Sequence, residues 1–556
     1  MKKLLFIAIG ILALNSLDAN AQRIKNAQKI TGAEVTYKTG SKSDKPVFVV
    51  KTIGDKSTAH PIKLNPGAPD LQEFVDFDDK TLYRSVFNNN GEASTTEKHF
   101  DYTKLDSIGT EKIAGWNTIH VRTSMRSNTI DIYYTPDMGY KGSPQPQTVI
   151  MDGMILKIVR NGNVMLEAVE AKQITESENL FPTNWGTIVD QVEFDHNVRN
   201  ANVIKIDVFN NERVSFNGVK NPDMLSETIV NNVAGGAIIM RKVKLPENVD
   251  NRSIFVELSE YSDGEAYDRV GSVFVIPTDK KQSFLDALTT KGVNSLPSFT
   301  NSTGTYQGLV STPDYDTPVE VMRFMTPFGV GAFNDIKVKG YEWADSVIFK
   351  AEVTHLAPML KNEVWIAAYV STWNAKGYKI SMNLKYHPSS RTNKANTIYP
   401  LFNTVSVLEQ AGQDYPTVFG NNDKLEVKIK LDKPIKNARI AYTTTGHGGW
   451  GGGDEFNPKL NTIYIDGKEI FKFIPWREDC ASYRHVNPCS GNFSNGLSSS
   501  DLSRSNWCPG TVTYPTYIPV GDLPKGEHTI SLKIDEGLPE GTSFSYWCVS
   551  AVLIGE

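Results

Sequence analysis

Short runs in which β-branched and aromatic residues alternate with polar residues recur along most of the chain. They include residues 129–135, 237–245, 271–276, 365–370, 425–431 and 529–534. Runs of this length and alternation predict β-strands. Between residues 187 and 386 a helical pattern is expected only over 279–291, with Asp279 as the candidate N-cap. The pattern therefore predicts an all-β protein.

Turn signals divide the predicted strands into domains. Asn161-Gly162 in the centre of residues 154–169 favours a two-residue hairpin turn. Polar stretches at 175–182 and 387–393 predict linkers. We expect a β-rich domain of unassigned role over residues 22–180, followed by domains over 187–388 and 392–556. The strand spacing in the last two domains favours β-sandwiches or jelly rolls.

The N-terminus has the pattern of a secretory signal peptide over residues 1–21. Lys2 and Lys3 precede an apolar run at 4–14, and an Ala-x-Ala site ends at Ala21. The apolar run is too short to span a bilayer, and no later stretch approaches the roughly 20 apolar residues that a span needs. The sequence predicts a secreted or periplasmic protein without a membrane partner.

Composition narrows the expected ligands of the 556-residue chain. The net charge is −5 and no basic block appears, so nucleic acid is not expected as a partner. Nine Trp and 22 Tyr favour uncharged, carbohydrate-like ligands. All four cysteines (Cys480, Cys489, Cys508 and Cys548) lie near the C-terminus and predict two disulfides in an exported chain. Their spacing is not that of a zinc site, and neither a metal nor a cofactor is expected.

A glycine-rich stretch at 440–458 is the most unusual segment of the sequence. Six glycines fall within the eight positions 446–453, around His447 and Trp450, and Asp454 and Glu455 follow. Glycine allows tight turns and close approach of a ligand, so the stretch predicts either the floor of a site or a flexible hairpin loop. Residues 446–451 also match the dinucleotide-binding pattern G-x-G-x-x-G, but no helix is predicted after them, which excludes a nucleotide site.

Two other positions are candidates for chemistry. Asp268 and Arg269 directly precede the strand predicted at 271–276. They could form a structural ion pair, or Arg269 could hold a functional carboxylate beside Tyr267 as a stacking face. Trp373 ends another predicted strand, where it could be a core residue or a sugar platform.

Six short motifs together resemble the peptide:N-glycosidase F family, which removes N-glycans from asparagine. They lie, in the order of the family, at 267–269, 323–328, 372–377, 445–447, 454–455 and 504–510, within roughly residues 200 to 556. The resemblance implies two tandem jelly-roll domains with the site in the cleft between them. It also implies hydrolysis of the asparagine–N-acetylglucosamine amide of N-linked glycoproteins and glycopeptides.

The resemblance assigns roles to particular residues. It places Asp268 at the principal catalytic aspartate and Glu455 at a second functional carboxylate. The implied substrate-binding positions are Tyr267, Arg269, Met325, Ser371, Trp373, His447, Arg504 and Trp507. It also implies a Cys489–Cys508 disulfide, which leaves Cys480 and Cys548 for a second bridge. Two residues depart from the family pattern: Ser371 stands where the family has an acid, and Asn457 where it has a cysteine.

These assignments lead to a mechanism in which Asp268 is the general base or water-positioning acid. Glu455 would polarise the amide or assist protonation of the leaving nitrogen. A monomer is expected. Two alternatives remain at the level of sequence. A carbohydrate-binding protein or adhesin would use the aromatic residues alone, and a glycoside hydrolase would also use two carboxylates.

Overall fold

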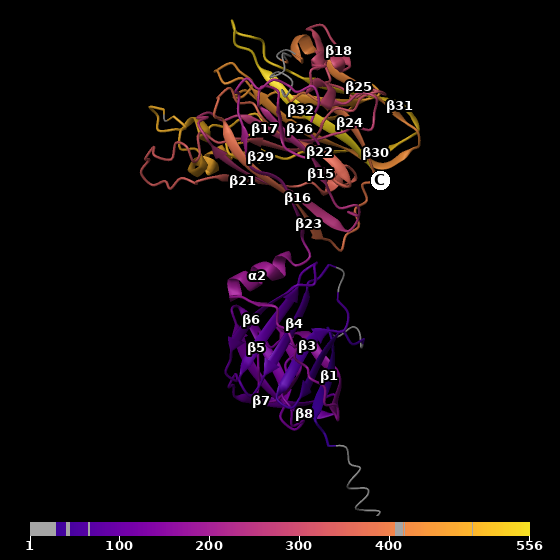
Figure 1. The fold of residues 1–556 in the computed structure, drawn as a ribbon, viewed down its shortest axis with the longest axis vertical. Coiled ribbons are helices and arrows are strands. Elements are labelled where there is room, and N and C mark those ends of the chain that lie inside the picture. The colour runs from indigo at the N-terminus through magenta and orange to yellow at the C-terminus, as the bar shows by residue number, and fades with distance from the viewer. Residues whose placement is uncertain (1–28, 41–44, 65–66, 406–414, 416–417, 492) are drawn as a thin grey trace, which may run out of the picture. The chain divides into compact units, whose positions relative to one another are not determined.

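The computed structural model describes residues 29–40, 45–64, 67–405, 415, 418–491 and 493–556 (Figure 1). The signal peptide expected at 1–21 lies outside these residues. The chain forms two compact units, Met1–Val203 and Ile204–Glu556. No helix among the described residues is long and apolar enough to cross a membrane.

The first unit is built on one 12-stranded sheet with the order β12-β6-β5-β4-β3-β2-β1-β11-β10-β9-β8-β7 (Figure 1). Its neighbouring strands are antiparallel, apart from the parallel pair β12–β6. The strands are β1 (Gly32–Lys38), β2 (Phe48–Ile53), β3 (Lys56–Pro61), β4 (Asp70–Asp76), β5 (Thr81–Phe87), β6 (Ala93–His99), β7 (Ser107–Ile113), β8 (Trp116–Met125), β9 (Asn128–Thr135), β10 (Met154–Arg160), β11 (Asn163–Ile174) and β12 (Thr187–Ile188). The hairpin predicted at 154–169 is confirmed as β10–β11, with positive φ at both Asn161 and Gly162.

The core of the first unit lies on one face of this sheet. Val35, Val50 and Ala59 are cross-strand partners on β1, β2 and β3, and all three are buried. Met138, from the segment between β9 and β10, packs into the same cluster together with Met154. That segment therefore fills part of the face that the strands leave open.

Helix α2 (Gln191–Asn200) ends the first unit and was missed by the sequence analysis. Asp190 caps it by accepting a hydrogen bond from the backbone N–H of Glu193. Phe194 is its only buried residue and packs near Val86. A helix with one apolar anchor gives no apolar stripe along the sequence, which explains why the helical pattern was not recognised.

The second unit contains two β-sandwiches, so the two tandem jelly rolls are confirmed. The sheets of the first have the orders β13-β23-β16-β21 and β14-β15-β22-β17-β20-β29, and those of the second β24-β32-β26-β30 and β25-β31-β27-β28. Their strands are β13 (Ile204–Val214), β14 (Asn231–Val233), β15 (Ile238–Lys244), β16 (Arg252–Ser262), β17 (Val270–Ile276), β20 (Val319–Met325), β21 (Val347–Glu352), β22 (Glu363–Val370), β23 (Tyr378–Pro388), β24 (Thr397–Asn403), β25 (Lys424–Leu431), β26 (Ile435–His447), β27 (Asn461–Ile465), β28 (Lys468–Phe473), β29 (Thr511–Thr513), β30 (Thr516–Leu523), β31 (Gly526–Ile534) and β32 (Tyr546–Gly555).

Strand β29 joins the two sandwiches. It comes from the C-terminal third of the chain but pairs with β20 of the first sandwich, with Arg323 opposite Thr513 and Met325 opposite Thr511. This pairing brings the ends of strands from both sandwiches together. A short hairpin of β18 (Ser298–Thr300) and β19 (Thr305–Gln307) lies outside the main sheets.

The prediction of a helix over residues 279–291 is mostly wrong. Only α3 (Phe284–Ala287) is helical there, and its N-cap is Ser283 rather than Asp279. The Ser283 hydroxyl accepts from the backbone N–H of Leu285, and the Asp286 carboxylate accepts from the Ser283 N–H. This capping box fixes the helix start four residues later than predicted. The remaining helical elements in the described part of the chain are 3₁₀ turns: η1 (Val293–Ser295), η2 (Thr354–Met359), η4 (Gly420–Asn422), η5 (Cys480–Val486) and η6 (Ser499–Asp501).

The expected disulfide pairing is also wrong. Cys480 pairs with Cys508, with 5.1 Å between their Cα atoms. Neither Cys489 nor Cys548 is disulfide-bonded, so one bridge forms instead of two. The backbone N–H of Cys489 donates to the carbonyl of Phe328, just after the end of β20, and Cys480 is the cysteine that lies beside Cys508. Cys548 is buried within β32.

Candidate active site

The two carboxylates proposed for catalysis line one pocket in the second unit. Asp268 lies in the loop between β16 and β17, and Glu455 follows the end of β26. The pocket has a volume of about 490 Å³. Eight of the ten site residues expected from the sequence line it: Asp268, Arg269, Met325, Ser371, Trp373, His447, Glu455 and Trp507. The other two, Tyr267 and Arg504, adjoin these residues in the structure.

Glu265 holds the loop that carries Asp268. Its carboxylate is 3% exposed and forms an ion pair with Arg269, at 3.1 Å between Oε2 and Nε. It also accepts hydrogen bonds from the Thr372 hydroxyl at 2.9 Å and from the backbone N–H of Tyr267 at 3.2 Å. The carboxylate that Arg269 holds is therefore Glu265 rather than Asp268. Asp268 remains available to a ligand in the pocket.

The backbone on either side of Asp268 is fixed by two further side chains. The backbone N–H of Arg269 donates to the Thr326 hydroxyl at 2.8 Å. The Tyr378 hydroxyl donates to the carbonyl of Tyr267 at 2.9 Å and lies 2.9 Å from the Thr326 hydroxyl. Because Thr326 and Tyr378 are buried, these bonds anchor the loop to the core of the first sandwich.

The glycine-rich stretch forms a compact turn that presents Glu455. A Cβ on Gly453 would lie 2.0 Å from the carbonyl oxygen of Gly448, so the chain crosses itself too closely for any side chain there. The Asn457 amide donates to the carbonyls of Gly451 and Gly453, at 3.0 and 2.8 Å. Asn457, at the position where the family pattern has a cysteine, thus stabilises the turn through these hydrogen bonds. Of the two sequence interpretations, the floor of a site fits better than a flexible loop.

Arg504 lies behind Glu455. Its side chain is 1% exposed, and its Nε donates to Oε1 of Glu455 at 2.9 Å. Its other nitrogens donate to the carbonyls of Leu502 and Ser499, at 3.0 and 2.9 Å. The guanidinium also packs 4.8 Å from the centre of the Trp507 ring. Arg504 therefore orients Glu455 and Trp507 together, out of direct contact with solvent.

Burial raises the pKa of both carboxylic acids. The pKa of Asp268 rises to about 6 because of burial, although the positive charges of Arg504 and Arg269 oppose the rise. The pKa of Glu455 rises to about 7 because of burial and the negative charge of Asp268, again opposed by Arg504. Two acids that interact in this way titrate as a pair. Burial and the repulsion between the two carboxylates therefore favour retention of a proton by the pair as the pH approaches neutrality.

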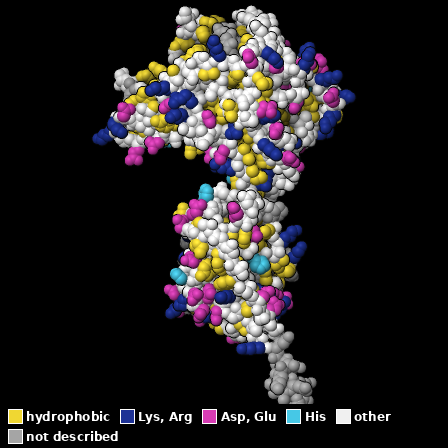
Figure 2. Space-filling model, viewed as in Figure 1, with side chains coloured by type: hydrophobic (Ala, Val, Ile, Leu, Met, Phe, Trp, Pro, Cys, Tyr) yellow, Lys and Arg dark blue, Asp and Glu magenta, His cyan; other side chains and the backbone are white. Residues whose placement is uncertain are grey.

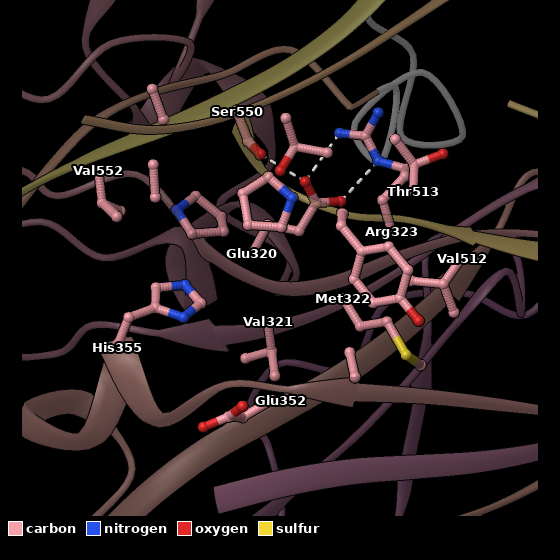
Figure 3. A pocket seen from close by; sticks show the side chains of 17 residues that line it. Glu320, Val321, Met322, Arg323, Glu352, His355, Val512, Thr513, Ser550 and Val552 are labelled. Carbon is pink, nitrogen blue, oxygen red and sulfur yellow. Dashed lines mark hydrogen bonds and ion pairs between the residues drawn. The ribbon is translucent and has the colours of Figure 1, made fainter. Parts of the chain in front are cut away.

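A buried chain of polar groups leads from the first sandwich to His447. Arg323 is paired with Glu320, at 2.6 Å between Nε and Oε1 (Figure 3). Arg323 also donates to the hydroxyl of Thr445, which lies 2.9 Å from Nε2 of His447. Burial and the charge of Arg323 lower the pKa of His447 to about 3. His447 is therefore neutral, and its Nε2 forms a hydrogen bond with the Thr445 hydroxyl.

Asp454, which was a supporting candidate beside Glu455, has a structural role. It is fully buried, accepts from the indole N–H of Trp547 at 2.8 Å and accepts from the backbone N–H of Gly537 at 3.1 Å. Its Oδ1 also lies 3.4 Å from Nζ of Lys459. Both carboxylate oxygens of Asp454 are bonded to these partners, so Asp454 stabilises the turn, whereas Glu455 lines the pocket.

Two aromatic residues at the pocket, Trp373 and Tyr267, are exposed in the way a sugar platform requires. Trp373 is 53% exposed, which excludes the core interpretation, and its ring centre lies 4.9 Å from that of Phe216. Tyr267 is 62% exposed and lies under the guanidinium of Arg269 at 5.5 Å. The Trp507 ring stacks against the neutral imidazole of His447.

One wall of the pocket was missed by the sequence analysis. It consists of Trp450, Thr542, Ser543, Phe544 and Tyr546. Trp450 belongs to the glycine-rich stretch, where its position among flexible residues was the available signal. The segment 542–546 carries no motif, and only the fold brings it beside Trp450.

Potential metal ligands among the described residues form one group, which does not belong to this pocket. It contains Asp479, Cys480 and Cys508. The two cysteines are joined to each other, so their sulfur atoms are not thiolate ligands. The chemistry of the pocket is that of two buried carboxylic acids beside a fixed guanidinium and exposed aromatic rings.

Comparisons with known proteins agree with this architecture. Models of the peptide-N-glycosidase F N-terminal and C-terminal domains match residues 205–386 and 414–554. A model of the N-glycanase peptide, N-terminal domain, matches residues 67–194. No curated protein matches the chain.

Solved structures are also similar to this chain. One structure of PNGF-II is 40% identical, covers 94% of this chain and 99% of its own, and superposes with a TM-score of 0.85. A second structure of PNGF-II is 41% identical over 95% of this chain and 98% of its own, with a TM-score of 0.80. PNGase F from Flavobacterium meningosepticum is 18% identical over 64% of this chain and 96% of its own, with a TM-score of 0.42. Because three family models match its domains and it is 40% identical to PNGF-II over 94% of its length, the chain belongs to the peptide-N-glycosidase F family.

Proposed function

We propose that the pocket of Asp268 and Glu455 is where this N-glycan amidase hydrolyses the bond between asparagine and N-acetylglucosamine. Family membership supports the reaction, which leaves aspartate in the peptide and releases the glycan. The observation that carries the site assignment is the single pocket that holds both acids, with the pKa of Asp268 at about 6 and that of Glu455 at about 7. This order supports an ionised base beside a protonated acid.

In this mechanism Asp268 removes a proton from water as the water attacks the side-chain carbonyl carbon of asparagine. Glu455 polarises the amide and supplies a proton to the departing nitrogen, so that the carbon–nitrogen bond breaks. The products are an aspartyl peptide and a glycosylamine, which loses ammonia in solution. Arg504 holds the Glu455 carboxyl in place throughout, because its Nε contacts the oxygen Oε1 and leaves Oε2 free to face the pocket.

The substrate-binding roles follow from exposure and position. Trp373 and Tyr267 present exposed rings on which sugar faces can stack. Ser371 lines the pocket where the family pattern has an acid, so it offers a hydroxyl to the second sugar in place of a charge. The described surface also suits an uncharged ligand: on the face that Figure 2 shows, Lys and Arg side chains are interspersed with Asp and Glu side chains.

The assignment is tested with Asp268→Asn and Glu455→Gln on a short N-glycopeptide. Each is expected to lower kcat/KM, by more than about 10²-fold for Asp268→Asn, since positioned acid–base groups contribute about 10²–10⁴-fold. Asp263→Asn is the matched control, because Asp263 is an acid of the same loop that pairs with Arg213. Near-normal turnover by Asp268→Asn would show that another group activates water.

We also propose that the protein is exported and acts as a monomer on N-linked glycoproteins and glycopeptides. Export is supported by the signal-peptide pattern at residues 1–21. Cell fractionation and light scattering of the mature protein test these two statements. Retention in the cytoplasm would contradict the first, and a stable dimer the second.

A further inference from the structure

The first unit contains a polar pocket of its own. It has a volume of about 480 Å³, close to the 490 Å³ of the catalytic pocket. Strands β5 and β6 form its floor, the segments 100–103 and 146–150 form two sides, and the start of α2 forms another. All of these elements belong to the same compact unit.

The floor is the polar end of a row that is otherwise apolar. Direct cross-strand partners run from Val35 through Val50 and Ala59 to Glu73, and then to Arg84 and Thr96. Residues in such a row share one face of the sheet. The apolar members are buried in the core and Glu73 is buried beside them, whereas Arg84 and Thr96 line the pocket together with Lys98. Leu82 and Ile150, which also line the pocket, belong to a small packed cluster with Val75 and Phe77, so the polar side chains of β5 and β6 lie beside an apolar edge.

The charges around the pocket balance. Arg84 forms an ion pair with the buried Glu73, at 3.0 Å, so its charge is already matched. Lys98 stands opposite the carboxylates of Asp101 and Asp195 in the lining. An anionic ligand would need a net positive lining, and an apolar ligand would need an apolar one. This pocket offers neither.

The remaining lining provides both hydrogen-bond donors and acceptors. The Gln147 and Gln191 amides and the Thr103 hydroxyl line the pocket. Each amide presents a carbonyl acceptor and an NH₂ donor, and each hydroxyl can act as either. A ligand with many hydroxyl groups matches such a surface.

One aromatic ring completes the site. Phe100 lines the pocket and is held by edge-on contacts with Phe77 and Tyr102, at ring-centre distances of 6.3 and 5.9 Å. These contacts fix the ring and leave it half-exposed. A fixed ring beside amides and hydroxyls provides an apolar face for the C–H side of a sugar and polar groups for its hydroxyls.

We propose that this pocket binds a neutral oligosaccharide, independently of the catalytic pocket. Its size matches that of the catalytic pocket, so it accommodates a short glycan segment rather than a single small solute. The identification of this oligosaccharide as the outer part of an N-glycan rests on the proposed function. The sugar class itself rests on the pocket alone.

The test is calorimetric titration of the full chain with a free biantennary N-glycan that carries no sialic acid. Wild-type protein is expected to bind two equivalents. Lys98→Ala/Gln147→Ala removes two exposed lining side chains and is expected to weaken one of the two events at least tenfold, while Trp373→Ala weakens the other. Lys112→Ala, on the exposed strand β7, is the matched control and should bind two equivalents.

The inference is overturned if wild type binds one equivalent that only Trp373→Ala removes, or if the double variant binds as wild type does. Hydrolysis of a short glycopeptide separates this result from the proposed function. The double variant should turn over the glycopeptide at the wild-type rate. A chain that binds two equivalents but hydrolyses nothing would refute the proposed function and leave the sugar site standing.

Discussion

Replacing Arg504 by Met should destabilise the protein in a pH-dependent way. Methionine keeps the unbranched packing against Trp507 but removes the charge and all the hydrogen bonds of the guanidinium. Two carbonyls, those of Leu502 and Ser499, lose their donor. Each buried acceptor left without a partner costs about 1–3 kcal/mol of unfolding free energy. This part of the loss is present at every pH.

The pH-dependent part comes from Asp268, whose pKa the charge of Arg504 holds down, and from Glu455, which Arg504 contacts directly. The folded pKa of Glu455, about 7, already lies above the value of 4.5 for an unperturbed glutamate, and Arg504 holds it down. Without Arg504 the folded pKa rises further. When the pKa of a carboxyl is higher in the folded than in the unfolded protein, the free energy of unfolding falls as the pH rises from the unfolded to the folded pKa. The variant therefore continues to lose stability above about pH 7, where the stability of wild type no longer changes through Glu455. Each added pKa unit widens the gap by about 1.4 kcal/mol, and breaking a buried ion pair costs about 3–5 kcal/mol in all.

The assay compares urea denaturation of wild type and variant at about pH 5 and about pH 9, on either side of the raised pKa. Arg477→Met is the matched control. Arg477 forms a two-bond ion pair with Asp479, and the pKa of Asp479 is lowered, mainly by that pair. Asp479 is charged at both pH values, so its variant should lose the same stability at each. A loss for Arg504→Met that is equal at the two pH values would refute the raised pKa of Glu455.

Three other outcomes follow from the site and the disulfide. The profile of kcat/KM against pH should be bell-shaped, with limbs near the pKa values of about 6 for Asp268 and about 7 for Glu455. Glu455→Gln should remove the falling limb, and a flat wild-type profile would contradict these roles. Trp373→Ala should raise KM for a glycopeptide about tenfold while shifting the denaturation midpoint little, since the ring is 53% exposed; an unchanged KM would exclude a platform role. Cys480→Ser should cost about 2–5 kcal/mol of stability and Cys489→Ser less than about 1 kcal/mol, and the reverse order would contradict the observed pairing.

Eight of the ten site residues expected from the sequence line one pocket, whereas the residues that support this pocket were not predicted. Strand patterns and six motifs singled out Asp268 and Glu455, because strand ends and acidic residues can be recognised from the sequence without knowledge of the fold. Glu265 lies three residues before Asp268 in the sequence, but its role depends on its contacts with Arg269 and Thr372, which only the fold reveals.

The errors have physical causes of the same kind. The prediction of the disulfide pairing was wrong because the spacing of cysteines along the chain does not reveal which of them meet in the fold, where Cys480 rather than Cys489 lies beside Cys508. Helix α2 was missed because Phe194 alone is buried along it. The segment 542–546 had no local signal, since it lies far along the chain from Trp450, with which it lines the same pocket.

Hydrolysis of a defined N-glycopeptide in water enriched with heavy oxygen tests the central claim most directly. Mass spectrometry of the peptide then shows where the water oxygen goes. Attack on the asparagine carbonyl carbon predicts a peptide with aspartate in place of the glycosylated asparagine, one heavy oxygen in that side chain and no sugar attached. A peptide that keeps an N-acetylglucosamine and contains no heavy oxygen would show cleavage of a glycosidic bond and contradict the account.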